Sequence, residues 1–158
     1  MAALLFYILL AAAQPAPSHP WNVYENARFG TLLAYPGDLF RSRTESDNGD
    51  GITLRAADGA TLAIFGSNNV ENASPAVYVR GLIGGDARYR RLSYRIVRAN
   101  FAILSGSVGN RLFYERYAFA PSGHVHGFVL EYPAAARARY DPIVPRLSAS
   151  LSWRPGRI

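Results

Sequence analysis

The sequence contains no cysteine, and this absence removes several classes of function at once. It excludes disulfide bonds, thiolate nucleophiles, cysteine-ligated metals and a lipid anchor on a processed cysteine. No phosphate-binding loop or dinucleotide fingerprint is present either, because the glycine-rich stretch at residues 81–85 follows a predicted helix, the wrong context for both. The chain must therefore fold by packing alone.

Lysine is also absent, so all 17 basic residues are arginine and the formal net charge is +6. The arginine fork binds phosphate and carboxylate groups bidentately, which makes an anionic surface one candidate partner. The arginines are scattered and form no run of five, so we favour a GC-rich genome as their origin. We expect no nucleic-acid partner, because the chain has no recognition-helix or RNA-binding aromatic signature.

Long hydrophobic runs are missing except at residues 1–13, MAALLFYILLAAA. About a dozen apolar residues ending in small ones are typical of an export signal, whereas a membrane span needs about 20. We predict a cleaved signal peptide at 1–13, a linker at 14–22, no transmembrane span after cleavage, and a location in the periplasm or outside the cell. The segment has no lysine or arginine before its apolar core, so a retained anchor or a misplaced start codon is the alternative.

The remaining chain fits one α+β domain over residues 23–154, because 49% hydrophobic and 13% aromatic residues suffice for a core. Alternating apolar residues predict a strand at 27–35, a polar loop at 44–51 and a hairpin of strands 52–57 and 60–65. Asp58-Gly59 is the favoured two-residue turn of that hairpin. Four further strands, predicted at 92–98, 101–108, 111–119 and 124–132, form a meander.

Two helices are predicted from the same capping pattern. Ser74-Pro75 supplies an N-cap and a first-turn proline for a helix at 75–83, and Asp141-Pro142 does so for a final helix ending near Trp153. One apolar stripe of this final helix is formed by Ile143, Leu147 and Leu151. Both faces of the meander are largely apolar, so we predict a mostly antiparallel sheet covered on both faces. The final helix covers one face, and the Ser74 helix or the N-terminal hairpin covers the other.

A resemblance to a known fold rests on several features in this order: Tyr24-x-Asn26-x-x-Phe29-Gly30, the strand end Tyr35-Pro36, the central helix, the meander, and a C-terminal helix with Ser148 and Ser150. Together they resemble the PsbP-like α/β/α sandwich of photosystem extrinsic subunits and many small exported bacterial proteins. The opening and the loop Asn48-Gly49-Asp50-Gly51 are similar to uncharacterised exported proteobacterial proteins. The resemblance implies a non-catalytic assembly or binding domain and transfers no active-site residue.

Motifs for metals and catalysis are incomplete. The stretch from Asp47 to Gly51 places glycine at two positions where an EF-type calcium loop needs oxygen ligands. His124-x-His126 puts two imidazoles on one strand face, but two ligands do not make a site. Ser105-Gly106-Ser107 lacks the glycine that a nucleophile elbow has two residues before its serine. It also leads into a hairpin, where the elbow requires a helix. We therefore assign no catalytic residue, no metal and no cofactor.

One polar cluster stands out in the meander. If the Pro121-Ser122 turn pairs Ala120 with Gly123, Tyr117 faces His126. The same logic at the two preceding turns places Leu104 beside Glu115 and Arg95 beside Leu104, so one sheet face collects Arg95, Glu115, Tyr117 and His126. A carboxyl group on such an apolar face must be paired or have a raised pKa. The cluster is either a polar ligand pocket or a structural ion pair, and we favour the ion pair.

We expect a non-catalytic binding or assembly domain of the cell envelope, with an envelope protein or an anionic surface as partner. The alternative is a small-ligand or metal carrier, or an enzyme, that uses the cluster of Arg95, Glu115, Tyr117 and His126. A concave pocket at that face favours the alternative, and a filled face favours the first interpretation.

Overall fold

The computed structural model describes residues 18–155, and the signal peptide predicted at residues 1–13 lies outside them. The strands are β1 (Trp21–Glu25), β2 (Thr31–Pro36), β3 (Phe40–Glu45), β4 (Gly51–Ala56), β5 (Thr61–Asn68), β6 (Leu92–Val97), β7 (Phe101–Val108), β8 (Arg111–Phe119), β9 (His124–Pro133) and β10 (Ser152–Trp153). The helices are α1 (Pro75–Gly85), α2 (Arg137–Tyr140) and α3 (Val144–Ser150), with 3-10 helices η1 (Ala87–Arg91), η2 (Ala134–Ala136) and η3 (Asp141–Ile143).

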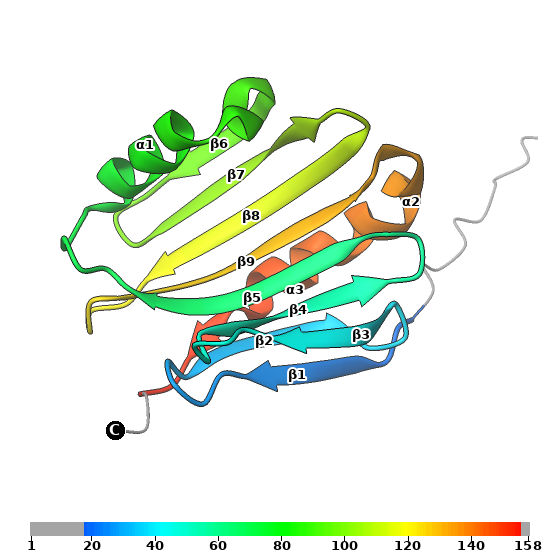
Figure 1. The fold of residues 1–158 in the computed structure, drawn as a ribbon, viewed down its shortest axis with the longest axis horizontal. Coiled ribbons are helices and arrows are strands. Elements are labelled where there is room, and N and C mark those ends of the chain that lie inside the picture. The colour runs from blue at the N-terminus through cyan, green and yellow to red at the C-terminus, as the bar shows by residue number, and fades with distance from the viewer. Residues whose placement is uncertain (1–17, 156–158) are drawn as a thin grey trace, which may run out of the picture.

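The strands form two sheets (Figure 1). The larger sheet has seven strands in the order β3-β4-β5-β9-β8-β7-β6, and the smaller has the order β1-β2-β10. Every pairing in both sheets is antiparallel. The prediction of a mostly antiparallel α+β fold is confirmed.

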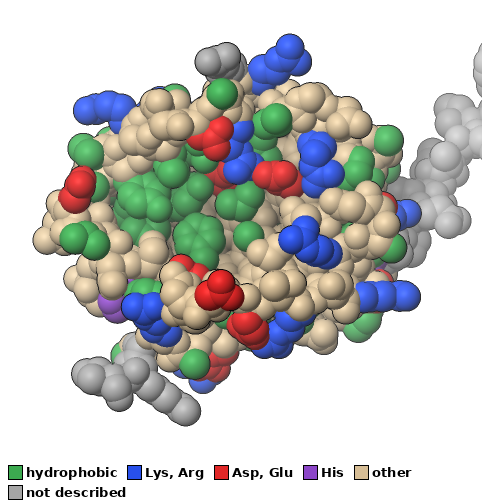
Figure 2. Space-filling view, viewed as in Figure 1, with side chains coloured by type: hydrophobic (Ala, Val, Ile, Leu, Met, Phe, Trp, Pro, Cys, Tyr) green, Lys and Arg blue, Asp and Glu red, His purple; other side chains and the backbone are tan. Residues whose placement is uncertain are grey.

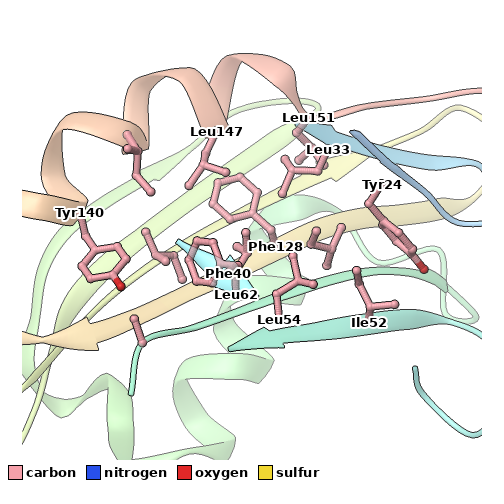
Figure 3. Packing of buried hydrophobic residues seen from close by; sticks show 14 of the residues in the cluster. Tyr24, Leu33, Phe40, Ile52, Leu54, Leu62, Phe128, Tyr140, Leu147 and Leu151 are labelled. Atoms are coloured by element: carbon pink, nitrogen blue, oxygen red, sulfur yellow. The ribbon is translucent and has the colours of Figure 1, made fainter. Parts of the chain in front are cut away.

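One face of the large sheet carries the main core. The small sheet and the C-terminal helices pack on this face, and Leu33 and Leu147 meet Leu54 and Phe128 there (Figure 3). In Figure 1 α3 runs behind β9 and β5. The predicted apolar stripe of the final helix, Ile143, Leu147 and Leu151, is buried in this core. The N-terminal strands thus share the face of the final helix.

The opposite face is covered by α1 and η1, as the Ser74 alternative predicted. Val79 of α1 and Tyr89 of η1 pack on Leu104 and Tyr117. The cover is partial, because aromatic side chains farther along this face, including Phe65, remain only partly buried. Figure 2 shows hydrophobic side chains in a hollow on this side of the molecule.

The local turn and cap signals position these elements. The Asp58-Gly59 hairpin is confirmed: the Asp58 carboxylate accepts from the Ala60 amide at 3.2 Å, and Gly59 has φ +84°. Ser74 caps α1, because its hydroxyl accepts from the Val77 amide at 3.4 Å. The bounds 101–108 and 111–119 predicted for two meander strands agree with β7 and β8.

The N-terminal elements were predicted less well. The predicted strand at 27–35 begins only at Thr31, because the buried Asn26 side chain accepts from the Phe29 amide at 2.7 Å and forms a turn. β1 precedes this turn and begins at Trp21, inside the segment predicted to be a linker. β3 runs up to Glu45, two residues into the predicted polar loop.

The C-terminal helical run begins earlier than predicted. α2 starts at Arg137, so Asp141 lies within the run and does not cap it. The Asp141 carboxylate instead accepts from the Tyr132 hydroxyl at 2.6 Å and pairs with Arg137 at 3.2 Å. Within residues 18–155, no helix is long and apolar enough to cross a membrane.

Candidate functional site

The predicted cluster is split between the two faces of the large sheet. The turn between β8 and β9 contains three residues, because the Ala120 amide donates to the His124 carbonyl at 2.9 Å. His126 therefore pairs with Ala118, and Tyr117 pairs with Gly127. A shift of one residue turns every side chain to the other face, so placing His126 beside Tyr117 was wrong.

Glu115 and Tyr117 do lie together, on the face covered by α1 and η1. The Glu115 side chain is 0% exposed. Its Oε2 atom accepts from the Tyr117 hydroxyl at 2.7 Å and from the Tyr89 hydroxyl at 2.9 Å. Its Oε1 atom lies 3.4 Å from a guanidinium nitrogen of Arg88. The carboxyl group expected to be paired or raised in pKa is thus paired here, with Arg88 as its charged partner.

Burial dominates the electrostatics of this carboxyl group. It raises the pKa of Glu115 above its usual value, because a buried carboxylate loses the solvation of its charge. The Tyr117 hydroxyl, the Arg88 guanidinium and the Tyr89 hydroxyl lower the same pKa but do not offset the burial. The pKa of both tyrosines is raised, first by burial and then by the neighbouring Glu115 charge.

Arg88 extends the cluster to the surface. It pairs with Glu131 of β9, and Arg111 lies 3.6 Å from the same Glu131 carboxylate. The Arg88 guanidinium also lies over the Phe113 ring, 5.2 Å from its centroid. These contacts fasten η1 to β8 and β9 and close the Glu115 carboxylate off from solvent. The geometry is that of a structural cluster.

Arg95 takes no part in the cluster. The predicted register is confirmed, since Arg95 pairs with Leu104 and Leu104 pairs with Glu115. However, the Arg95 side chain is exposed, and Arg88 supplies the positive charge beside Glu115. Sequence reasoning missed Arg88 and Tyr89 because they lie in a 3-10 helix just after the predicted end of α1, where no hydrophobic period marks them.

His126 occupies a separate site under the small sheet. It is 0% exposed, its Nδ1 lies 2.7 Å from the Thr31 hydroxyl, and its ring stacks on Trp153 with centroids 5.0 Å apart. Burial lowers the pKa of His126 to about 4, with a smaller contribution from His124. The imidazole is therefore neutral at pH 7 and connects β9 to both β2 and β10.

Metal binding finds no support in the arrangement of side chains. Within residues 18–155, no three His, Asp or Glu side chains come together as ligands. In the loop that superficially resembles a calcium site, the Asn48 carbonyl accepts from Arg28 at 2.7 Å and the Gly49 carbonyl accepts from Asn26 at 2.9 Å. These carbonyl oxygens thus already serve protein donors.

A comparison with solved structures identifies the architecture. The chain is similar to the solution structure of cyanobacterial PsbP (CyanoP) from Synechocystis sp. PCC 6803, with a TM-score of 0.61. The likeness covers 92% of this chain and 99% of that one, at 13% sequence identity. The fold is PsbP-like. No protein-family model and no curated sequence matches the chain.

On this PsbP-like fold the charge is unevenly distributed. Residues 75–100 contain six of the 17 arginines and one of the 11 acidic residues, so these 26 residues carry +5 of the net +6. They form α1, η1 and β6, and α1 lies against β6. Figure 2 shows arginine side chains projecting at its upper margin, where α1 and β6 lie in Figure 1.

Four exposed arginines define this region, here called the basic edge: Arg80, Arg91, Arg95 and Arg98. None of them forms an ion pair with an acidic residue in the described part of the chain. By contrast, six other arginines do so: Arg43, Arg88, Arg111, Arg137, Arg139 and Arg154. The search for a run of five charges missed the basic edge because three elements contribute to it.

Proposed function

We propose that this chain is an exported domain of the cell envelope that binds an anionic partner through its basic edge and catalyses no reaction. The observation that carries the proposal is the concentration of +5 in residues 75–100, without acidic partners for the four exposed arginines. Unpaired surface arginines attract carboxylate or phosphate groups and accelerate association with an oppositely charged partner. The short apolar run at residues 1–13 supports export.

The buried cluster supports the non-catalytic part of the proposal. A general acid or a ligand-binding carboxylate has to reach its substrate within hydrogen-bond distance. Glu115 is 0% exposed, and Tyr89 and Tyr117 both donate to one of its oxygens. With His126 on the opposite face, the structure does not bring together the four residues that the enzyme alternative used.

The proposal is tested by capture from the protein's own envelope. The mature chain, tagged at its C-terminus, is incubated with periplasmic extract, and bound proteins and small molecules are identified by mass spectrometry. One variant carries Arg80→Gln, Arg95→Gln and Arg98→Gln at the basic edge. The matched control carries Arg41→Gln, Arg43→Gln and Arg55→Gln on β3 and β4, which removes the same charge elsewhere.

We expect a protein partner that is retained at low salt, released at high salt and lost only by the basic-edge variant. Equal retention by both variants would contradict the role of the basic edge. A small molecule retained by native mass spectrometry, without any protein, would instead support the carrier alternative. Fractionation of cells that produce the full chain tests export separately, and a cytoplasmic, uncut chain would contradict it.

A further inference from the structure

β6 has an open side. It ends the seven-stranded sheet, so no strand in residues 18–155 pairs with its outer side. The Arg98 amide donates to the Phe101 carbonyl at 2.8 Å across the turn to β7. Because the direction of backbone groups alternates along an antiparallel strand, the amides and carbonyls of Val97 and Arg95 point away from β7. Such groups are a template for another strand.

The middle of β6 is accessible to a partner. Ser93, Tyr94 and Arg95 are all exposed, and Tyr94 exposes 51% of its surface, which is unusual for a large aromatic residue. Tyrosine is among the residues enriched at protein interfaces.

The side chains of β6 favour a strand over a flat surface as the partner. Arg95 lies opposite Leu104 on the α1 face, whereas Tyr94 lies opposite Ser105 on the other face. A membrane or another flat surface contacts one of these faces at a time. A strand added beside β6 sends its own side chains alternately to both faces, so it meets Arg95 on one and Tyr94 on the other.

The charge selects which strand is accepted. Charged side chains on an edge strand repel an identical edge, which disfavours pairing of β6 with β6 of a second copy. The same arginines favour a segment with acidic residues, since opposite charges on neighbouring strands attract. Arg91 and Arg98 flank the strand at its two ends, so the positive charge extends along its whole length.

We propose that β6 binds an extended acidic segment of a partner protein as an additional strand of the large sheet. The segment's backbone bonds to the outward groups of Arg95 and Val97, and its acidic side chains meet Arg95 and the exposed Arg80 of α1, the helix that contacts β6. This proposal rests on the proposed function and specifies the chemistry of the anionic partner. It belongs to the recognition mode in which main-chain bonds give affinity and side chains give specificity.

The probe is a capped peptide of about eight residues in which glutamate alternates with threonine, long enough to span β6. A peptide with lysine in place of glutamate reverses the charge. A third peptide keeps the glutamates but replaces two threonines with proline, so that it cannot add as a strand. We expect the mature protein to bind the first peptide at least roughly tenfold more tightly than either control at low salt.

Two variants at one position separate charge from backbone pairing. Arg95→Gln and Arg95→Pro both remove the same charge, but only proline also removes the outward amide. We expect Arg95→Gln to weaken binding roughly threefold and Arg95→Pro to weaken it severalfold further. Arg55→Gln, an exposed arginine on β4, is the matched control and is expected to bind like the unchanged protein.

A measurement on the unchanged protein avoids any folding defect of Arg95→Pro. The acidic peptide is expected to slow hydrogen exchange at the amides of Arg95 and Val97 and to leave exchange across β3 unchanged. Equal binding of the proline-containing acidic peptide, with no added protection at these amides, would overturn the strand proposal.

Vesicles and self-association provide two further outcomes. Binding to phosphatidylglycerol vesicles without binding of the acidic peptide would overturn the proposal in favour of a lipid surface. Concentration-dependent dimers that protect the β6 amides would overturn it in favour of a second copy. If the acidic peptide fails but the envelope capture still depends on the basic edge, only the strand proposal fails. If both fail, the proposed function fails as well.

Discussion

The two edge strands of the seven-stranded sheet, β3 with two arginines and β6 with one, lie among different numbers of acidic residues. At the β3 edge, residues 38–50 contain two arginines and four acidic residues, and Arg43 pairs with Glu45. At the β6 edge, residues 75–100 contain six arginines and one acidic residue. The count of arginines on a strand therefore says little about binding, because the neighbouring carboxylates decide whether the charge is available to a partner.

The two edges also differ in how the rest of the molecule supports them. The β3 edge lies on the side of the main core, where Phe40 is buried with Leu54 and Tyr140. The β6 edge depends on α1 and η1, and η1 is held to the sheet by the Glu115 cluster. The buried carboxyl group thus supports the segment next to β6 while being closed off from solvent itself. Substitutions or a change of pH should therefore destabilise the two edges to different extents.

Removing the Glu115 side chain should have the largest effect. Glu115→Ala leaves the Arg88 charge and the two tyrosine hydroxyls without their shared partner, so we expect the free energy of unfolding to fall by about 3 to 5 kcal/mol. Glu115→Gln keeps an acceptor for the tyrosines and should cost about 1 to 3 kcal/mol. Chemical denaturation measures both.

Hydrogen exchange in the Glu115→Gln variant shows which elements the substitution destabilises. We expect faster exchange in η1 and β6 and unchanged exchange in β3. Uniformly faster exchange across both edges, or an alanine variant as stable as the unchanged protein, would show that the cluster does not support the basic edge.

Lowering the pH should change the stability contributions of the two faces of the large sheet in opposite directions. The folded-state pKa of His126 is about 4, below the usual 6.5, so the stability that depends on the neutral imidazole is present above pH 6.5 and is lost as the pH falls toward 4. The loss amounts to about 3 kcal/mol. The pKa of Glu115 is raised, so its contribution has the opposite sign and weakens as the pH rises through that pKa.

Thermal unfolding between pH 7 and pH 4 checks this prediction. In the unchanged protein the midpoint should fall on acidification, with exchange rising first in the small sheet, where Thr31 and Trp153 contact His126. His126→Gln should flatten the dependence. An unchanged slope in that variant would place the acid sensitivity elsewhere.

The smallest effect is expected from removing acidic residues at the β3 edge, which leaves the charge of its arginines uncompensated. Glu45→Gln and Asp47→Asn remove two exposed acidic residues at this edge, of which Glu45 pairs with Arg43. Exposed pairs contribute little, so affinity for the alternating glutamate and threonine peptide should rise by less than roughly threefold. Titration calorimetry at low salt measures the change. A rise to the affinity of β6 would mean that net charge alone, and not the arrangement at β6, determines binding.

The sequence predicted much of this fold because its turns carry local chemistry. Asp58-Gly59, the Ser74 cap and the short turns of the meander define elements through residues only a few positions apart. The pairing of Leu104 with Glu115 followed from one such turn and is confirmed. Asn26 was harder, since its side chain ends β1 through contacts with the distant Gly49 as well as the nearby Phe29.

The candidate site was predictable only in part. Whether Pro121-Ser122-Gly123 makes a two-residue or a three-residue turn decides the face of His126, and composition alone does not distinguish them. Gly123 has φ +81°, which suits the longer turn. The basic edge needs tertiary structure to be seen, because Arg80 and Arg95 are 15 positions apart and belong to two elements, α1 and β6, that come into contact only in the fold.

The most direct test of the central claim is an amide titration of the isotope-labelled mature protein with the alternating glutamate and threonine peptide at low salt. The prediction is that resonances of Arg95, Val97 and their neighbours on β6 shift, that those of β3 do not, and that added salt reverses the shifts. Shifts spread over both edges, or confined to β3, would contradict a partner site at the basic edge.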